Sequence, residues 1–384
     1  MTFELAQRLI DNIFDEKYSA ITPDNTIGLI LSFIGGEPFL QVDLMEKICD
    51  YTFDKMFKLN HPWLPYTMVS ICSNGVLVGE DKKTQRFLEK YRPVIDMSIS
   101  IDGCQELHDT CRVDFSGQGS YIRAMKGVNY VEALFGKKPS TKMTFAPANI
   151  TYVSKALINL IELGYDNIPA NCVFEPGWTY EDATIFYNEL EKVADYIIDN
   201  GLNDKVAISI FEEDIGYMIP PEENTSYCGG TCYKNISMDY RGNFYPCIRY
   251  MESSLNNKQE PFFFGDIENG IGGTQIQRDR IELMDSVTRR SQSTDECFYC
   301  PIGQGCAYCS ACCYEYSGSP NKRITYICPM HKARVLANVY YWNKLFKKLE
   351  IEEAHVFKLN LPKEECLKII PEEEYNLLKE LERR

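Results

Sequence analysis

Apolar residues in the first 211 positions recur with two periods. Short continuous apolar runs are typical of strands buried on both faces, and runs with apolar residues three and four positions apart are typical of amphipathic helices. The strands are predicted at residues 26–34, 66–72, 94–101, 142–146, 168–174 and 205–211. The helices are predicted at residues 2–16, 42–59, 82–90, 119–135, 153–163 and 180–199. Strands that alternate with helices through short links predict an α/β fold with a parallel sheet.

Five of the predicted strands end in turn sequences. These are Gly35-Gly36-Glu37-Pro38, Ser73-Asn74-Gly75, Asp102-Gly103, Pro147-Ala148-Asn149 and Glu175-Pro176-Gly177. Gly-Gly-Glu-Pro alone is also a good helix start, and Asp-Gly alone is an ordinary turn. Because successive parallel strands end at the same edge, we expect all five endings to collect at one rim of a barrel or open barrel, where such folds bind ligands.

The pattern changes after residue 211, where loop and turn sequences dominate. Residues 236–245 predict a hairpin whose ends present Cys232 and Cys247. Helices are predicted at 275–290 and 330–349, and an amphipathic helix at 371–384. We therefore divide the chain into an α/β domain (1–215), a cysteine-rich domain (216–335) and a C-terminal helical segment (336–384).

The chain contains 16 cysteines, and they are concentrated in its second half. The stretch from position 297 to 328 holds Cys297, Cys300, Cys306, Cys309, Cys312, Cys313 and Cys328, and Cys228, Cys232 and Cys247 lie upstream. Thiolates two or three residues apart in tight turns can ligate one metal centre. Ten candidates exceed the needs of one centre, and in a reducing compartment they favour metal or cluster ligation over disulfides.

Composition excludes several other classes. The net charge of −15 repels phosphate backbones, so nucleic acid is not expected as a partner. No apolar run is long enough for a membrane helix, and the first residues lack the order of a secretion signal. We predict a cytoplasmic protein.

These motifs resemble the radical S-adenosylmethionine (radical SAM) enzymes that carry a C-terminal SPASM domain. The matches are Gly35 to Pro38, Ser100-Ile101-Asp102-Gly103, and the spacing of Cys232, Gly242 and Cys247. The resemblance implies a partial (βα)6 barrel that lacks its first strand, then a small cysteine-rich SPASM domain and C-terminal helices. It also implies an S-adenosylmethionine site at the rim. The residues assigned to that site are Gly35, Gly36, Glu37, Pro38, Asn74, Ser100, Asp102 and Arg112.

Within this resemblance, each residue group has an expected role. The Gly-Gly-Glu-Pro turn would hold the ammonium group of the methionyl part, and the segment from Ser100 to Gly103 would lie near its ribose and carboxylate. The family pattern also extends over His108-Asp109 and Arg112. Arg112 could hold a carboxylate with two hydrogen bonds or form a surface ion pair.

The same resemblance assigns the cysteines to two auxiliary 4Fe-4S clusters. The first cysteine group is Cys228, Cys232, Cys247 and Cys309, and the second is Cys297, Cys300, Cys306 and Cys328. The family spacing would put the last ligand of the first group at Ser310, so Cys309 is the nearest thiolate and Cys312 or Cys313 could serve instead. We expect most of the cysteines at 49, 72, 104, 111, 172 and 366 to be small buried residues, with the roles of Cys104 and Cys111 near the rim left open.

One family motif is missing. Radical SAM catalysis needs Cys-x3-Cys-x2-Cys after the first strand, and no three cysteines in this sequence have that spacing. A truncated start or a degenerate, non-catalytic member would account for this, so we expect no turnover by this chain and name no catalytic residue. The complete enzyme would bind S-adenosylmethionine, take electrons from an external donor and close thioethers in a small cysteine-rich precursor peptide.

Two alternatives remain at this point. Two four-cysteine zinc sites would make the chain a binding or scaffold protein, because cysteine spacing alone does not separate zinc from iron-sulfur clusters. A formylglycine-forming sulfatase maturase is the second alternative. Those relatives place an acid directly after the cysteine at position 247, whereas this chain has Ile248.

Overall fold

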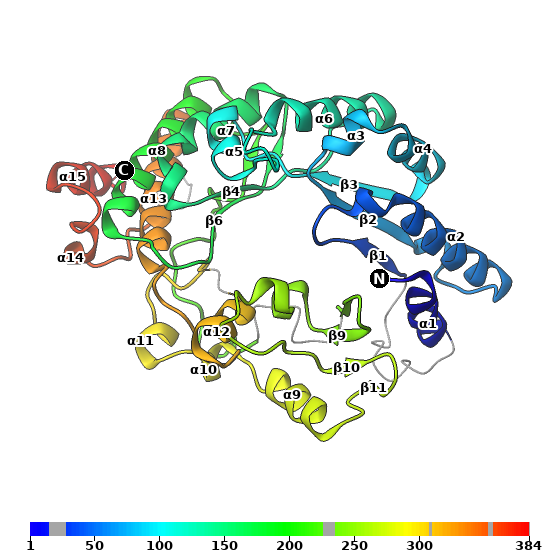
Figure 1. Ribbon diagram of the computed structural model, residues 1–384. Coiled ribbons are helices and arrows are strands. Elements are labelled where there is room, and N and C mark those ends of the chain that lie inside the picture. The colour runs from blue at the N-terminus through cyan, green and yellow to red at the C-terminus, as the bar shows by residue number, and fades with distance from the viewer. Residues whose placement is uncertain (15–27, 226–234, 307–308, 352–355, 384) are drawn as a thin grey trace.

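The first half of the chain forms parallel strands covered by helices on their outer side (Figure 1). The computed structural model describes residues 1–14, 28–225, 235–306, 309–351 and 356–383. Its first seven strands are β1 (Ile30–Phe33), β2 (Met68–Ser73), β3 (Ile95–Ile99), β4 (Met143–Phe145), β5 (Asn167–Ile168), β6 (Ala170–Cys172) and β7 (Ala207–Ile208). Strands β1, β2 and β3 are neighbours in that order, β4 pairs with β6, and β5 pairs with β7, all in parallel.

The helices that connect these strands follow the predicted order. They are α1 (Phe3–Phe14), α2 (Val42–Lys58), α3 (Val76–Glu80), α4 (Lys82–Lys90), α5 (Gln105–Cys111), α6 (Tyr121–Phe135), α7 (Val153–Glu162) and α8 (Tyr180–Asp199). Helices α2 to α8 and the strands enclose one large core, whereas α1 packs in a smaller cluster with Ile48 and Met56 of α2. The α/β class predicted from the alternating pattern is therefore confirmed.

Three predicted strands differ in the structure. The strand predicted at 205–211 is reduced to β7, Ala207–Ile208. The strand predicted at 168–174 is interrupted at Pro169, which has no N–H to donate to a neighbour, so β5 and β6 pair with different partners. The strand predicted at 26–34 covers only Ile30–Phe33 among the residues described. The short helices α3 and α5 were missed, because five and seven residues are too few for a clear helical period.

The cysteine-rich part contains a small antiparallel sheet, drawn below the parallel strands in Figure 1. Its strands are β8 (Ser237–Met238), β9 (Asn243–Tyr245), β10 (Gly265–Asp266) and β11 (Gly270–Ile271), in the order β11-β10-β9-β8. Strands β8 and β9 form the predicted hairpin. Short helices follow it: α9 (Gln275–Asp285), α10 (Arg289–Gln292), α11 (Asp295–Phe298) and α12 (Ser310–Ser317). The helix predicted at 275–290 ends early because Thr288 caps the start of α10.

The long helix α13 (Cys328–Lys348) joins the two halves. It begins at a predicted metal ligand, and its buried residues belong to the main core. It packs along α8, as Figure 1 shows at the side of the molecule where α15 (Glu372–Leu381) and α14 (Lys363–Cys366) also lie. The predicted division at 335/336 falls inside α13, and the three-part division remains a prediction. Among the described residues, no helix is both long and apolar enough to cross a membrane.

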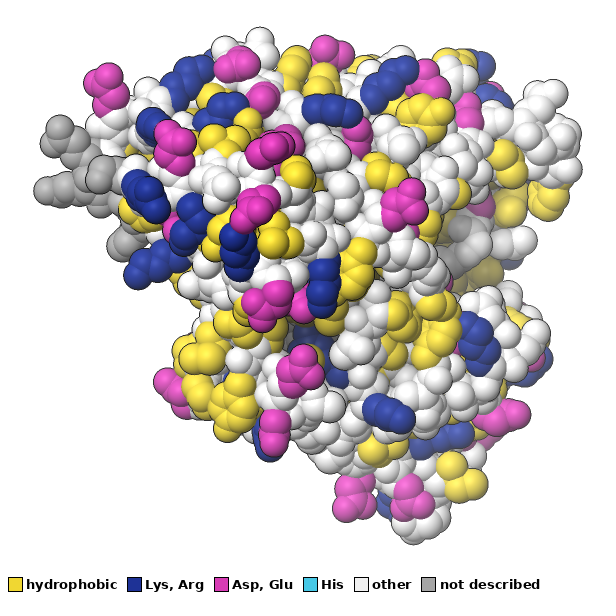
Figure 2. Space-filling view, turned by 90° about the vertical axis from the view of Figure 1, so that its left-hand side faces the viewer, with side chains coloured by type: hydrophobic (Ala, Val, Ile, Leu, Met, Phe, Trp, Pro, Cys, Tyr) yellow, Lys and Arg dark blue, Asp and Glu magenta, His cyan; other side chains and the backbone are white. Residues whose placement is uncertain are grey.

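Charged side chains of both signs are interspersed over the face shown in Figure 2. Lysine and arginine side chains on this face lie between aspartate and glutamate side chains and do not form a separate basic stripe. This face therefore offers no concentrated positive field for a polyanion.

Gly103 is held tightly against helix α7. Its φ is +90°, and a Cβ atom there would lie 2.4 Å from Ala156 Cβ and 2.6 Å from Ala156 O. At Gly136, whose φ is +74°, an added Cβ atom would have no heavy atom within 4 Å. We expect Gly103→Ala to lower the free energy of unfolding by about 3 kcal/mol or more, from backbone strain plus overpacking. Gly136→Ala should cost about 1 kcal/mol from strain alone. Urea denaturation of both variants checks this, and equal losses would contradict it.

Candidate functional site

The turn after β1 has a backbone that only glycine adopts easily. Gly35 has φ +100° and Gly36 has φ +54°, and both residues are exposed. A Cβ built at either glycine meets no heavy atom within 4 Å, so the turn presents open backbone at its surface. This geometry leaves room for a ligand to approach the main chain.

Glu37 fastens this turn to the end of the neighbouring strand β2. Its carboxylate accepts hydrogen bonds from the Ser73 hydroxyl (2.9 Å), from the Asn74 backbone N–H (2.8 Å) and from the Phe39 N–H (3.2 Å). The last of these caps the short helix η1 (Pro38–Gln41). Asn74 is exposed and its side-chain oxygen accepts from the N–H of Val76, at the start of α3. The Glu37 carboxylate therefore holds the Gly35-Gly36 turn against the end of β2 and also places a negative charge there.

The ends of the next strands are joined in the same way. Ser100 N–H donates to the Ser73 carbonyl at 3.0 Å, and Thr144 N–H donates to Asp102 Oδ1 at 3.0 Å. Val173 N–H, after β6, donates to the Phe145 carbonyl at 2.9 Å. The carboxyl ends of β1, β2, β3, β4 and β6 are thus neighbours, as predicted. We call this edge, from Gly35 to Glu175, the rim.

Asp102 and Arg112 bind each other at the rim. Arg112 donates to Asp102 through Nε and, at 3.2 Å, through Nη2, which is the two-bond geometry expected for a guanidinium and a carboxylate. Asp102 is buried and the Arg112 side chain is about one third exposed. Arg112 was expected either to hold a carboxylate with two hydrogen bonds or to form a surface ion pair. In the structure it makes two hydrogen bonds to a carboxylate of the same chain, that of the buried Asp102.

His108 contacts the backbone of this pair. Its Nδ1 accepts from the Asp102 N–H at 3.3 Å, and its Nε2 lies 3.1 Å from the Ser120 hydroxyl. Burial lowers the pKa of His108 to about 4, with a further lowering by Arg112 and an opposing effect of Asp102. The imidazole is therefore neutral at pH 7.

The depressed pKa of His108 predicts a loss of stability in acid. The unfolded chain takes up this proton near pH 6.5, whereas the folded chain resists it down to about pH 4. The contribution is complete above pH 6.5 and is lost as the pH falls to 4, with a total of about 3 kcal/mol. Denaturation at several pH values should show a shallower decline for His108→Gln than for the unmodified chain over this window. Identical slopes would contradict the assignment.

The second cysteine group gathers residues from three segments. Cys297 lies in α11, Cys300 and Cys306 lie in the turns that follow, and Cys328 is the first residue of α13. Burial raises the pKa of Cys306, and the charges of Cys297 and Cys300 raise it further. Burial likewise raises the pKa of Cys328 to about 12, with added effects of Cys306 and Cys297. The four thiols are therefore within electrostatic reach of one another.

Such a group favours a bound cation. Cys300, Cys306 and Cys328 resist ionisation, because burial raises the pKa of each thiol and neighbouring thiolates raise it further. A cationic centre removes this penalty and displaces the protons. Within the described residues, no three His, Cys, Asp or Glu side chains lie close enough together to share a single metal ion.

Only part of the first cysteine group can be described. Cys228 and Cys232 lie outside the described residues. Cys247 immediately precedes the short helix η6 (Ile248–Tyr250), and Cys309 immediately precedes α12. Both pack against one apolar cluster, formed by Tyr245, Tyr250, Leu255, Phe262, Met284, Ala311 and Tyr314.

Among the three candidates for the last ligand of this group, Cys309 has the environment of a thiolate. A hydrogen bond from Cys312 lowers the pKa of Cys309 to about 6, assisted by backbone N–H groups and the Arg249 charge, against the effect of burial. Burial and the neighbouring Cys309 raise the pKa of Cys312, and burial raises that of Cys313 to about 11. Both of these are fully buried in α12.

The remaining cysteines fit the expectation only in part. Cys49, Cys104 and Cys366 are buried, as expected for small apolar residues. Cys72 and Cys111 are exposed, because each lies at the end of an element near the rim. The exposure of Cys72 departs from the expected burial, whereas the role of Cys111 was left open. Cys172 is intermediate, and burial raises its pKa to about 12.

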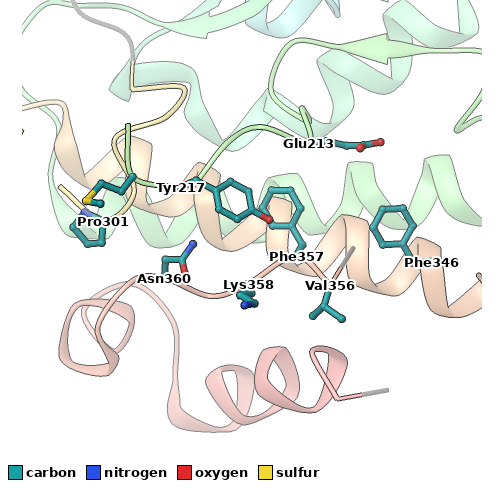
Figure 3. A pocket seen from close by; sticks show the side chains of 9 residues that line it. Glu213, Tyr217, Pro301, Phe346, Val356, Phe357, Lys358 and Asn360 are labelled. Carbon is teal, nitrogen blue, oxygen red and sulfur yellow. The ribbon is translucent and has the colours of Figure 1, made fainter. Parts of the chain in front are cut away.

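A cavity of about 830 Å³ lies apart from these residues (Figure 3). It is lined by Glu213, Tyr217, Met218, Pro301, Phe346, Val356, Phe357, Lys358 and Asn360. The Tyr217 and Phe357 rings form an aromatic pair at its wall, 5.5 Å between centroids. None of the predicted rim residues lines it, and only Pro301 comes from the second cysteine group's turns.

Sequence reasoning missed two arginines beside the cysteine groups. Arg249 Nη2 donates to Cys312 Sγ at 2.7 Å, and Arg323 Nη2 donates to Cys306 Sγ at 3.1 Å. The only sequence signal is a basic residue near a candidate ligand. That signal is too common to single out these two residues.

The parallel strands, whose carboxyl ends form one rim, and the cysteine-rich half that follows them make a mixed α/β fold that is shared with radical SAM structures. Solved structures of anSMEcpe, an anaerobic sulfatase-maturating radical SAM enzyme, share this fold. The structure with bound AdoMet matches with a TM-score of 0.60 and 16% identity, over 92% of this chain and 91% of that one. A tagged form with AdoMet gives a TM-score of 0.62 and 18% identity, over 98% and 90%. The structure with AdoMet and a peptide matches with a TM-score of 0.59 and 17% identity, over 91% of this chain and 90% of that one.

Sequence comparison adds less. No protein-family model matches the chain. The uncharacterized protein MJ0907 of Methanocaldococcus jannaschii is 28% identical over 169 residues, which are 44% of this chain. The match spans about half of that relative, 51% of its length. At these identities the comparisons establish the fold, and the activity remains to be proposed.

Proposed function

We propose that this chain binds S-adenosylmethionine at the rim and one 4Fe-4S cluster at each cysteine group, and that it serves in the maturation of a ribosomally made, cysteine-rich peptide. The observation that carries the proposal is the fold shared with a radical SAM enzyme, and the electrostatic effects of Cys297, Cys300 and Cys306 on other thiols of the second cysteine group support it. Four thiolates are the usual ligand set of a 4Fe-4S cluster.

The rim residues fit the cofactor's polar groups. The open glycine backbone of Gly35 and Gly36 can accept the ammonium group through its carbonyls, and Glu37 holds that turn in place. Arg112 is oriented by Asp102, so its guanidinium is ordered before a carboxylate arrives. Bound S-adenosylmethionine and a reducing cluster would supply the radical chemistry, and the chain supplies binding and orientation.

For the first cysteine group we propose Cys309 as the fourth ligand, with Cys228, Cys232 and Cys247. Its lowered pKa means that the thiolate is available at neutral pH, whereas Cys312 and Cys313 are buried thiols. The N–H groups at the start of α12 support the charge of Cys309.

In a form that carries the Cys-x3-Cys-x2-Cys motif, one electron from an external donor would cleave S-adenosylmethionine to methionine and a 5′-deoxyadenosyl radical, which would take a hydrogen atom from a peptide carbon. A cysteine sulfur would then bond to that carbon with loss of its proton. The cysteine groups would hold the clusters that supply an acceptor for the surplus electron. The peptide loses two hydrogens and 5′-deoxyadenosine is released. The 384 residues contain no Cys-x3-Cys-x2-Cys, so this activity requires a form that carries the motif.

The likeness to anSMEcpe favours one second candidate, formation of formylglycine. Ile248 follows Cys247 directly and provides no acid at that position. Mass spectrometry distinguishes the candidates, because thioether closure removes only hydrogen whereas formylglycine formation also exchanges sulfur for oxygen.

The test compares this chain with a version extended at its N-terminus by an engineered segment that carries Cys-x3-Cys-x2-Cys. Each is reconstituted anaerobically and incubated with S-adenosylmethionine, dithionite and a cysteine-rich peptide. We expect 5′-deoxyadenosine and hydrogen loss from the peptide only with the extended version. Turnover by the chain alone would refute the need for the motif, and an unchanged peptide under an active extended version would refute the thioether assignment.

A further inference from the structure

The C-terminal part of the chain lies along helix α8. Residues 361–381, which include α14 and α15, are called the C-terminal strap, and Figure 1 shows both helices beside α8 and α13. Side-chain hydroxyls of α8 donate to the strap at three positions: Tyr180 to Glu365 at 3.3 Å, Thr184 to the Ile369 carbonyl at 2.7 Å, and Tyr187 to Glu374 at 2.6 Å. Residues three or four positions apart share one face of a helix, so a single face of α8 holds the strap.

Other contacts hold the strap in a way that does not change near neutral pH. Its apolar residues Ile369, Leu378 and Leu381 are buried in the main core. Glu365 also accepts from Lys332 and Lys368, at 2.5 Å each, and these hydrogen bonds lower the pKa of Glu365 to about 2. This carboxylate is therefore ionised throughout the neutral range.

One position on the same face of α8 differs, because it brings two acids together. Glu191 lies four residues after Tyr187, and its carboxyl group is hydrogen-bonded to that of Glu374 on α15. Asp195, four residues further along α8, adds a negative charge to this group. On α13, Lys344 donates to Asp195 at 2.6 Å and to the Tyr340 hydroxyl at 2.5 Å, so its charge is already paired.

The two carboxyl groups can stay in contact only while a proton lies between them, because two carboxylates repel each other. Burial raises the pKa of Glu191 to about 8, and the charges of Glu374 and Asp195 raise it further, against a hydrogen bond from Tyr187. Burial and the charge of Glu191 raise the pKa of Tyr187, so the phenol is neutral. At pH 7 the protonated Glu191 carboxyl therefore donates to Glu374.

We propose that the C-terminal strap is a pH-sensitive device, in which a proton held between Glu191 and Glu374 keeps α15 on α8 and rising pH loosens it. When α15 leaves α8, Glu191 meets water and its pKa returns to the ordinary value of 4.5. Between pH 4.5 and about 8 the docked form thus binds one proton more than the open form. Docking is strongest below this window, weakens as the pH rises through it and is constant above it.

Hydrogen exchange of the full chain, followed by mass spectrometry, tests this device. Protection factors of the α15 amides are taken relative to the exchange rate of an unstructured peptide at the same pH. Between about pH 5.5 and pH 7.5 they should fall by up to about tenfold per pH unit, because one proton separates the two forms. The amides of α2 provide the internal reference and should not follow this fall. Equal falls in α2 and α15, or constant protection of α15, would overturn the proposal.

Glu191→Gln should abolish the pH dependence of α15, because an amide N–H donates to Glu374 at every pH. Glu374→Gln should reduce it, because the charge that faces Glu191 is gone. Glu373→Gln is the matched control: Glu373 is also in the first turn of α15 but is exposed, so this variant should keep the slope of the unmodified chain. Should Glu191→Gln fail to fold, Glu374→Gln decides. An unchanged slope in either variant would overturn the proposal.

Discussion

Removing two thiols of the second cysteine group, by the double substitution Cys300→Ala and Cys306→Ala, should halve the iron content of the reconstituted chain. The unmodified chain is expected to hold about eight irons and the variant about four, because each cluster contains four. The reason is that only two thiolates of the second cysteine group remain, and two ligands cannot hold a four-iron cluster. Iron and acid-labile sulfide, measured per chain after anaerobic desalting, give the result.

The control for this variant is Cys49→Ala. Cys49 is buried in α2 and far in sequence from both cysteine groups, and its side chain belongs to the main core. Its loss should cost about 1 kcal/mol of stability from the small cavity and leave the iron content unchanged. Iron that stays at about eight in the double variant would remove Cys300 and Cys306 from the ligand set.

Glu37→Ala should weaken S-adenosylmethionine binding at least about tenfold, which corresponds to 1.4 kcal/mol. The carboxylate accepts two backbone N–H bonds and one hydroxyl bond, from Phe39, Asn74 and Ser73. Without it the Gly35-Gly36 turn loses its attachment to β2, and the stability of the fold should fall by about 2 kcal/mol. Equilibrium dialysis with labelled S-adenosylmethionine measures the affinity, and urea denaturation measures the stability.

Glu46→Ala is the matched substitution for this experiment. Glu46 is a half-exposed acid on α2 whose ion pair with Lys90 is a surface contact, so its loss should cost less than about 1 kcal/mol and leave binding unchanged. Glu37→Gln keeps one acceptor oxygen and should fall between the two. An affinity for S-adenosylmethionine that is equal in all four proteins would contradict the role assigned to the Gly-Gly-Glu-Pro turn.

Elements with a strong local pattern were predictable from the sequence. The amphipathic helices α2 and α8 and the buried strand β3 have a clear period, and their bounds differ from the prediction by a few residues at most. The neighbouring rim turns also followed, because parallel strands must end at one edge. The break at Pro169 was visible in the sequence, yet the apolar residues on both sides suggested one continuous strand.

Side-chain contacts between distant segments could not be read in this way. The pairing of Asp102 with Arg112, and of Arg249 with Glu175 and Cys312, depends on how the rim and the cysteine-rich half meet. The periodic pattern of apolar residues does not predict how the rim contacts the cysteine-rich half. The proposed preference for Cys309 over Cys312 and Cys313 likewise rests on the start of α12, where a hydrogen bond from Cys312 and backbone N–H groups lower the pKa of the first thiol and the other two are buried.

The rim and the two cysteine groups together give the chain a consistent chemistry. The rim offers open glycine backbone and an oriented arginine for a zwitterionic, charged cofactor. For the second cysteine group we propose that a bound cluster stabilises the charges of Cys300, Cys306 and Cys328, whose pKa values burial raises. The zinc alternative shares the ligands but predicts a different metal, so metal identity separates the two accounts.

Elemental analysis of the chain purified without oxygen tests the central claim most directly. Iron, acid-labile sulfide and zinc are measured on the same sample and divided by the protein concentration. The account predicts about eight irons and an equal amount of sulfide per chain, with no stoichiometric zinc. About two zinc ions per chain with no sulfide would contradict it and favour a zinc-stabilised binding protein.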